Sequence, residues 1–254
     1  MESSAASPLP FAHPFHPTLS DAEEVRSILE HKVPPELAIQ IVSLGYNPWL
    51  AKRRAHEGDY YADYTKPDAK HCVASLYLTS ECIPNDGHRV VPQRIIFQTS
   101  AAYQGYITSD GKDGFLNSHT RFDASILRPL SSKVDGTGQD VPLEEALSDT
   151  WWDPESATDA LKEKGWEFVA AEDGRTAWRV CNNSEALAEY QDYKVEWTRG
   201  AQAATEDDEP LGRGEGFLEL LKPGYIVVLW VRTGLRCWCN KVRAATIEIE
   251  YELP

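Results

Sequence analysis

Residues 214–254 read GEGFLELLKPGYIVVLWVRTGLRCWCNKVRAATIEIEYELP and hold two dense apolar runs joined by a short aromatic segment. In the second run, Ile247 and Ile249 alternate with Glu248 and Glu250. A period of two predicts a β-strand with one buried face and one face in water. We therefore expect the two isoleucines inside the fold and the two glutamates in solvent. Two such runs are typical of the closing strands of an antiparallel sandwich.

Further segments share the β-branched and aromatic composition of strands. They are Cys72 to Leu78, Arg89 to Thr99, Tyr103 to Thr108, Phe115 to Leu127, Trp166 to Ala170, Trp178 to Cys181 and Tyr190 to Trp197. Pro92 indicates an edge strand or a bulge, because proline cannot donate to a ladder. A short helix is expected around 157–164, a surface loop at 131–142, and a long, flexible, acidic loop at 199–216. The sequence thus predicts a mainly β fold, an antiparallel β-sandwich of jelly-roll type, over residues 67–254.

The amino-terminal third has a different composition. Residues 1–19 are rich in Pro, Ser and His and predict a flexible arm. Residues 20–66 predict a helical segment, since Ser20 followed by acidic residues is typical of a helix start. A second helix should begin at Pro34 and stop near Gly45, because proline is tolerated in a first turn.

The predicted second helix carries more apolar surface than a short isolated helix can bury. Its residues Leu37, Ile41 and Val42 must be covered by the rest of the chain or by another protein, so we interpret them as a docking element. The basic run from Lys52 to Arg54 predicts a solvated helix end.

Charge and cysteine content limit the classes of partner and the compartment. The 254 residues carry a formal charge of −15, from 25 basic and 40 acidic side chains, which disfavours nucleic acid as a partner. The longest apolar stretch, Ile226 to Val231, is far shorter than a membrane span, so no membrane partner is expected. The first residues lack the features of a secretory signal, and five dispersed cysteines suit a reducing compartment. The expected location is intracellular, in the cytoplasm or the nucleus.

Four stretches carry a family resemblance: VPPELA at 33–38, RIIFQTSAAYQGY at 94–106, the segment from Trp178 to Trp197, and GFLELLKPGYIVVLWVR at 216–232 with the later IEIEYE. Together they resemble a group of fungal proteins of unassigned function. The resemblance implies an F-box-like amino-terminal segment, of the kind that docks on an Skp1-type adaptor of a ubiquitin ligase. For the remainder it implies a galactose-binding-like β-sandwich that recognises glycans or proteins.

Two features predict a ligand-binding surface. Trp151 and Trp152 are adjacent, and neighbouring side chains of an extended chain cannot both face the core. His119 and Arg121 lie with Asp123 on one face of a predicted strand, opposite Phe122. We expect Trp151, Trp152, His119 and Arg121 to contribute to recognition.

No local motif of a known catalytic class is present, and no cofactor is expected. Cys237 and Cys239 would supply only two of the four ligands of a zinc site, so no metal site is expected. The interpretation that fits best is a non-enzymatic recognition or adaptor protein that binds a protein or glycan. Two alternatives stay open: an F-box-like substrate receptor of a ubiquitin ligase, and an enzyme that uses the polar residues of the sheet face.

Overall fold

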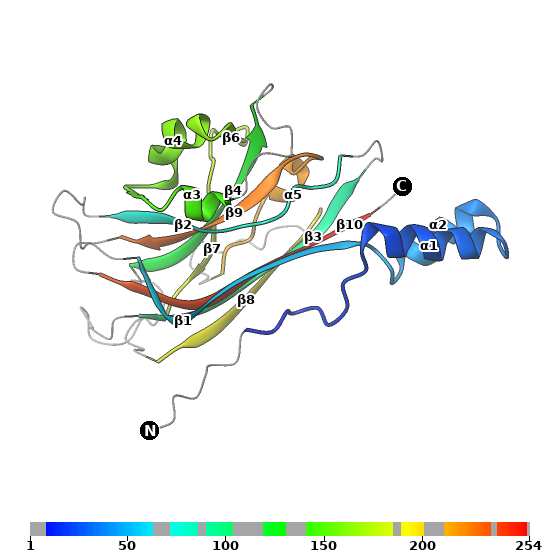
Figure 1. Ribbon diagram of the computed structural model, residues 1–254, viewed down its shortest axis with the longest axis horizontal. Helices are drawn as coiled ribbons and strands as arrows, with labels where there is room; N and C mark the ends of the chain where they lie inside the picture. Colours follow the sequence, from blue (N-terminus) through cyan, green and yellow to red (C-terminus); the bar gives the residue numbers. More distant parts are fainter. Residues whose placement is uncertain are drawn as a thin grey trace.

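A computed structural model shows a mainly β protein with two antiparallel sheets in a sandwich-like arrangement and a short amino-terminal helical segment (Figure 1). This confirms the predicted fold class at that level. The residues it describes are 9–62, 72–85, 90–103, 119–130, 141–184, 189–200, 211–234 and 238–252.

Sheet A has the strand order β1-β10-β3-β8, so the first and the last strand of the chain lie side by side. Its strands are β1 (Trp49–Ala62), β10 (Asn240–Glu252), β3 (Val91–Tyr103) and β8 (Gln191–Thr198). Pro92 pairs with Tyr251 next to a register shift on β10, which agrees with the predicted bulge.

Sheet B has the order β5-β2-β9-β4-β6, and β7 also pairs with β4. Its strands are β5 (Thr150–Trp151), β2 (Val73–Thr79), β9 (Ile226–Thr233), β4 (Thr120–Pro129), β6 (Trp166–Phe168) and β7 (Trp178–Asn182). The short helices are α3 (Leu143–Ala146), the 3-10 helix η1 (Pro154–Ala157), α4 (Thr158–Glu163) and α5 (Phe217–Leu220). Helices η1 and α4 fall where a helix around 157–164 was predicted.

The chain buries two apolar layers. The first lies between the sheets and includes Phe97, Ile249 and Leu229. The second lies on the outer face of sheet B, where Trp230 and its neighbours pack against the segment that carries α3 and α4 (Figure 1). Because β9 is covered on both faces, its sequence is continuously apolar instead of alternating.

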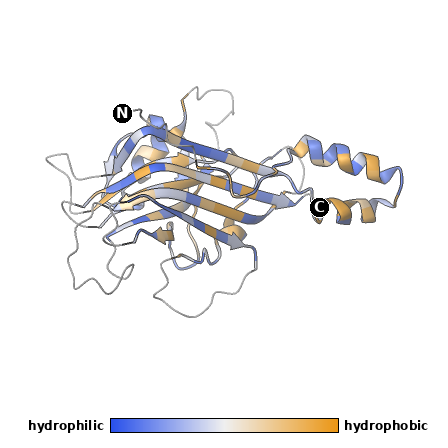
Figure 2. Cartoon of the chain, turned by 90° about the horizontal axis from the view of Figure 1, so that it is seen from below, coloured by the Kyte–Doolittle hydropathy of each residue, from blue (hydrophilic) through white to orange (hydrophobic). Residues whose placement is uncertain are grey.

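Helices α1 (Leu19–Glu30) and α2 (Pro35–Ser43) form a hairpin that projects away from the sandwich (Figures 1 and 2). The cap of α1 is Thr18 and not the predicted Ser20: its side chain accepts from the Asp21 amide, and the Asp21 carboxylate accepts from the Thr18 amide. None of the helices in the described ranges is long and apolar enough to cross a membrane.

The helical segment predicted over 20–66 is shorter in the structure, because β1 begins at Trp49. The basic run that was expected at a helix end therefore lies in a strand. Arg54 donates from Nη1 to the Tyr77 carbonyl at 2.5 Å, and the Arg53 guanidinium lies over the Phe11 ring. The pairing of β1 with β10 joins residues about 200 positions apart, for example Trp49 with Glu250, so local sequence patterns do not indicate it.

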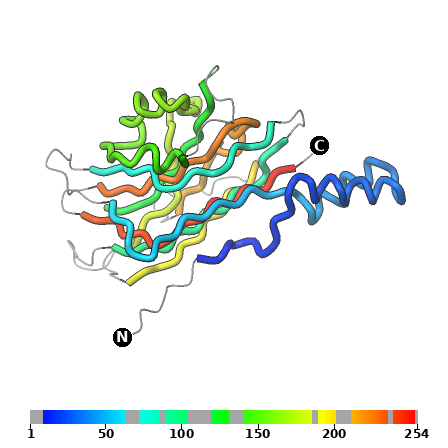
Figure 3. The backbone as a smooth tube through the Cα atoms, in the orientation of Figure 1, coloured from blue at the N-terminus to red at the C-terminus, as the bar shows by residue number. Residues whose placement is uncertain are grey.

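The expectation that Glu248 faces water is wrong. Its side chain is fully buried although Ile247 and Ile249 do face the core as predicted. Residues 9–17 of the arm run beside β1 and β10 (Figure 3). In this arm the backbone amides of Ala12 and His13 donate to the two carboxylate oxygens of Glu248, at 2.8 and 2.9 Å. The outer face of sheet A at this point is thus covered by the chain's own amino-terminal segment.

The two predicted loops fall largely outside the described residues, which omit 131–140 and 201–210. The end of the second loop is described and is anchored. The Gly212 amide donates to the Val180 carbonyl at 2.8 Å, and Trp197 Nε1 donates to the Gly212 carbonyl at 2.7 Å. Gly214 has a φ of +62° and its backbone lies so close to the Trp197 ring that a β-carbon would overlap it.

Candidate functional site

Three arginines lie on adjacent strands of sheet B. Arg121 on β4 is the register partner of Arg232 on β9, and Asp123, two positions along β4, is the partner of Arg179 on β7. Side chains two positions apart on a strand share a face. Phe122, between them, points into the core between the sheets. The outer face of sheet B therefore carries the charged residues.

Asp123 is the centre of this group. Arg232 donates from Nη1 to Asp123 Oδ2 at 2.8 Å, and Arg121 donates from Nε to the same oxygen at 3.2 Å. The exposed fractions of the side chains are 5% for Asp123, 11% for Arg232 and 44% for Arg121. The Nε atom of Arg232 is buried and has no hydrogen-bond partner among the described residues. This is an unusual state for a buried donor, which costs free energy until a partner is supplied.

A cleft of about 480 Å³ opens beside this group, within the range of about 300–1,000 Å³ that is common for small-ligand sites. It is lined by Ala177 and by six charged side chains: Arg121, Arg179, Arg232, Asp123, Asp153 and Glu155. The formal charges of the lining cancel.

Local structure fixes the acidic wall of the cleft. Asp153 is the N-cap of η1, and its Oδ1 accepts from the Ser156 amide at 2.8 Å. Glu155 Oε1 accepts from Thr176 Oγ1 at 2.6 Å, which ties η1 to the segment before β7. Each contact uses one oxygen of the carboxylate, and the other oxygen can accept from a ligand.

Arg179 is the lining residue with an unused cationic side chain. Its side chain is exposed and takes part in no hydrogen bond or ion pair with any residue in the described ranges. A guanidinium held at the rim of a cleft without a partner can bind a ligand oxygen in its planar, two-pronged geometry.

The tryptophan pair directly precedes Asp153, one of the residues that line the cleft. Trp151 pairs with Ala74 of β2, and its ring packs edge-on against Trp230 with centroids 6.1 Å apart. Trp152 has 36% of its surface exposed, and the next residue, Asp153, lines the cleft. Of the four residues predicted for recognition, the structure brings Trp151 and Arg121 to the outer face of sheet B, and Arg121 alone lines the cleft.

His119 is elsewhere. Its ring packs edge-on against Trp238 with centroids 4.9 Å apart, and Trp238 packs in turn on Tyr103. His119 is not part of the cleft lining. Of the acid–base set of His119, Arg121 and Asp123, the structure joins Arg121 to Asp123 and leaves His119 out of the cleft lining.

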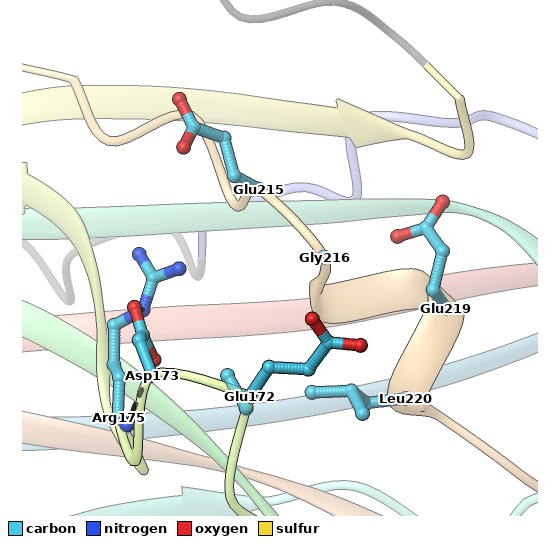
Figure 4. A pocket seen from close by; sticks show the side chains of 8 residues that line it. Glu172, Asp173, Arg175, Glu215, Gly216, Glu219 and Leu220 are labelled. Carbon is cyan, nitrogen blue, oxygen red and sulfur yellow. Dashed lines mark hydrogen bonds and ion pairs between the residues drawn. The ribbon is translucent and has the colours of Figure 1, made fainter.

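A second pocket, of about 420 Å³, lies between the 171–175 turn and α5 (Figure 4). Its charged lining residues are Glu172, Asp173, Arg175, Glu215 and Glu219. Figure 4 shows Asp173 beside Arg175, whereas the three glutamate carboxylates lie apart from one another. The distance from Arg175 Nε to Asp173 Oδ2 is 3.6 Å. Within the described residues, no group of three or more His, Cys, Asp or Glu side chains could hold a metal ion.

The predicted docking residues lie on the projecting hairpin. Leu37 and Ile41 are 47% and 45% exposed, whereas Val42 is buried. Ile28 and Leu44 add further exposed apolar surface to the hairpin.

Four charged cleft residues were not singled out in the sequence: Asp153, Glu155, Arg179 and Arg232. One signal was available for Arg232, which is a charged residue directly after the continuous apolar run of a buried strand. No protein-family model matches this chain, and a search of curated proteins finds no relative. The functional assignment therefore depends on the geometry of the cleft.

Proposed function

We propose that this chain is a non-enzymatic, intracellular recognition protein that binds a glycan in the charged cleft of sheet B. The observation that carries the proposal is that Arg179, Asp153 and Glu155 line one cleft, while the partly exposed Trp152 directly precedes Asp153 in the chain. Sugar hydroxyls can donate to carboxylates and accept from guanidinium groups, while an aromatic ring covers the apolar face of a pyranose. A protein ligand is the other occupant that this chemistry permits.

The arrangement of the rest of the molecule supports this choice of face. The amino-terminal arm covers the outer face of sheet A around Glu248, and helices α3 and α4 cover the apolar part of sheet B. The cleft lies where the apolar cover of sheet B ends.

The test is a glycan array followed by titration calorimetry on wild type, Trp152→Ala and Arg179→Ala. Loss of an anchoring side chain should weaken binding by about 2 kcal/mol or more while leaving the fold intact. Arg175→Ala, which removes an exposed arginine from the other pocket, is the matched control and should bind as wild type does. Unchanged binding in both cleft variants, with unchanged thermal stability, would place the site elsewhere.

A second candidate function is that of an F-box-like substrate receptor, and the observation that favours it is the projecting hairpin with exposed Leu37 and Ile41. We propose an Skp1-type adaptor as its occupant. Hydrogen exchange of the hairpin should slow when the purified adaptor is added, and Leu37→Asp should abolish that protection whereas Glu36→Lys should not. Exchange that the adaptor leaves unchanged would contradict this role.

A further inference from the structure

We infer that the ligand of the cleft is an acidic sugar, a pyranose that carries one carboxylate, as uronic acids do. This inference rests on the proposed function and narrows it to a substrate class. It follows from the hydrogen-bond partners that the charged side chains of the cleft still lack.

The first observation concerns the cations. Arg232 Nη1 is used by Asp123, and its Nε atom is buried out of reach of solvent, so this Nε is not a donor for a ligand in the cleft. The Arg179 guanidinium, in contrast, is exposed at the cleft and has no hydrogen bond or ion pair with any described residue. The N–H groups of the Arg179 guanidinium match the paired oxygens of a carboxylate, which a guanidinium binds through parallel, charge-assisted hydrogen bonds. A neutral sugar would offer these donors only hydroxyl oxygens.

The second observation concerns the anions. Asp153 and Glu155 stand in the same lining, and each has one oxygen engaged by a neighbouring serine or threonine. Their remaining oxygens can only accept, so the ligand must also supply donors. A ligand with several hydroxyl groups and one carboxylate supplies donors for Asp153 and Glu155 and acceptors for Arg179.

The charge balance argues against a phosphate. The three arginines only cancel the three acids of the lining, in a chain with a formal charge of −15. A group with nearly two negative charges would be repelled more strongly by Asp153 and Glu155 than a carboxylate with one. An acidic peptide would supply the carboxylate but few hydroxyl donors for the acidic wall.

The experiment is a calorimetric titration of the full chain with three matched probes: an oligosaccharide ending in glucuronic acid, the same oligosaccharide ending in glucose, and a glutamate-rich peptide. We expect the glucuronate probe to bind about 10- to 100-fold more tightly than the glucose probe, which is the ratio that hydrogen bonds to a charged group supply. Arg179→Gln should reduce the affinity for the glucuronate probe to that for the glucose probe, while Arg175→Gln should preserve the difference. Raising the ionic strength should weaken binding of the glucuronate probe more than that of the glucose probe.

The possible results separate this inference from the proposed function. Equal affinity for both sugar probes, lost in Trp152→Ala, would overturn the acidic-sugar inference and leave glycan recognition standing. Binding of the peptide alone, dependent on Arg179, would overturn the sugar class. Binding of none of the three probes, with glycan arrays also negative, would overturn both proposals.

Discussion

Glu248 on β10 and His16 in the amino-terminal arm lie 3.0 Å apart, from Oε2 to Nε2, although 232 positions separate them in the sequence. The same carboxylate accepts from the amides of Ala12 and His13 and from Gln98 Nε2. His13 also stacks on Trp49, with ring centroids 4.5 Å apart. The described part of the arm therefore packs on sheet A, and these contacts hold in place the residues that precede α1.

Replacement of Glu248 by alanine should lower the free energy of unfolding by about 3 kcal/mol, because each buried donor left without an acceptor costs about 1–3 kcal/mol. Urea denaturation measures the loss, and limited proteolysis should show faster cleavage within residues 9–17. Glu196→Ala on the exposed side of β8 is the control and should change stability by less than about 0.5 kcal/mol. Equally small losses in both variants would show that the arm does not depend on this carboxylate.

Ile249 is fully buried between the sheets. Ile249→Ala should cost about 2–5 kcal/mol, since it removes buried methyl groups and leaves a cavity. Lys194→Ala, at an exposed position of β8, serves as the comparison in the same denaturant titration. A loss below 1 kcal/mol for Ile249→Ala would contradict the assignment of this position to the core.

Asp123→Asn should destabilise the protein by about 3–5 kcal/mol, because it leaves the buried guanidinium of Arg232 without a counter-charge. Arg121→Ala removes the more exposed partner and should cost less than about 1 kcal/mol. Thermal denaturation of the two variants tests this difference. A larger loss for Arg121→Ala than for Asp123→Asn would mean that the buried pair is not the dominant contact.

His56 makes stability depend on pH. Burial, assisted by the positive charge of Arg54, holds the pKa of His56 below its usual value of 6.5. As the pH falls through 6.5, the unfolded chain binds a proton that the folded chain does not, so this contribution to stability is present above pH 6.5 and lost below it.

Between pH 7 and pH 5, His56→Gln should therefore lose less stability than wild type. Urea titrations at both pH values test the difference. Parallel pH profiles for the two proteins would contradict the lowered pKa.

Alternation along a strand was enough to predict the mainly β fold and the buried positions of Ile247 and Ile249. It failed at Glu248 because alternation reports which residues share a face, and not what covers that face. The arm that covers Glu248 comes from the other end of the sequence. The basic run from Lys52 to Arg54 was misassigned for a similar reason, since its strand depends on pairing with β10.

The cleft was only partly predictable. The sequence indicated Arg121, because local spacing sets the face of a strand residue. It also indicated the Trp151–Trp152 pair, which directly precedes the lining residue Asp153. Arg179 and Arg232 join Arg121 through the register of β7 and β9 with β4, which depends on long-range pairing. His119 was placed with Arg121 by the same spacing, but it comes just before β4 begins, where the alternation of the strand does not hold.

The central claim is that the charged cleft of sheet B binds the ligand, and nuclear magnetic resonance of the ¹⁵N-labelled protein tests it most directly. Titration with the oligosaccharide ending in glucuronic acid should shift the amide signals of residues 121–123, Asp153, Glu155 and 177–179 and the indole signal of Trp152. Signals from the acidic pocket at 171–175 and 215–220 should stay unchanged, as should those of α1 and α2. Shifts confined to the acidic pocket or to the helical hairpin, with none at Arg121, Arg179 or Trp152, would contradict the account.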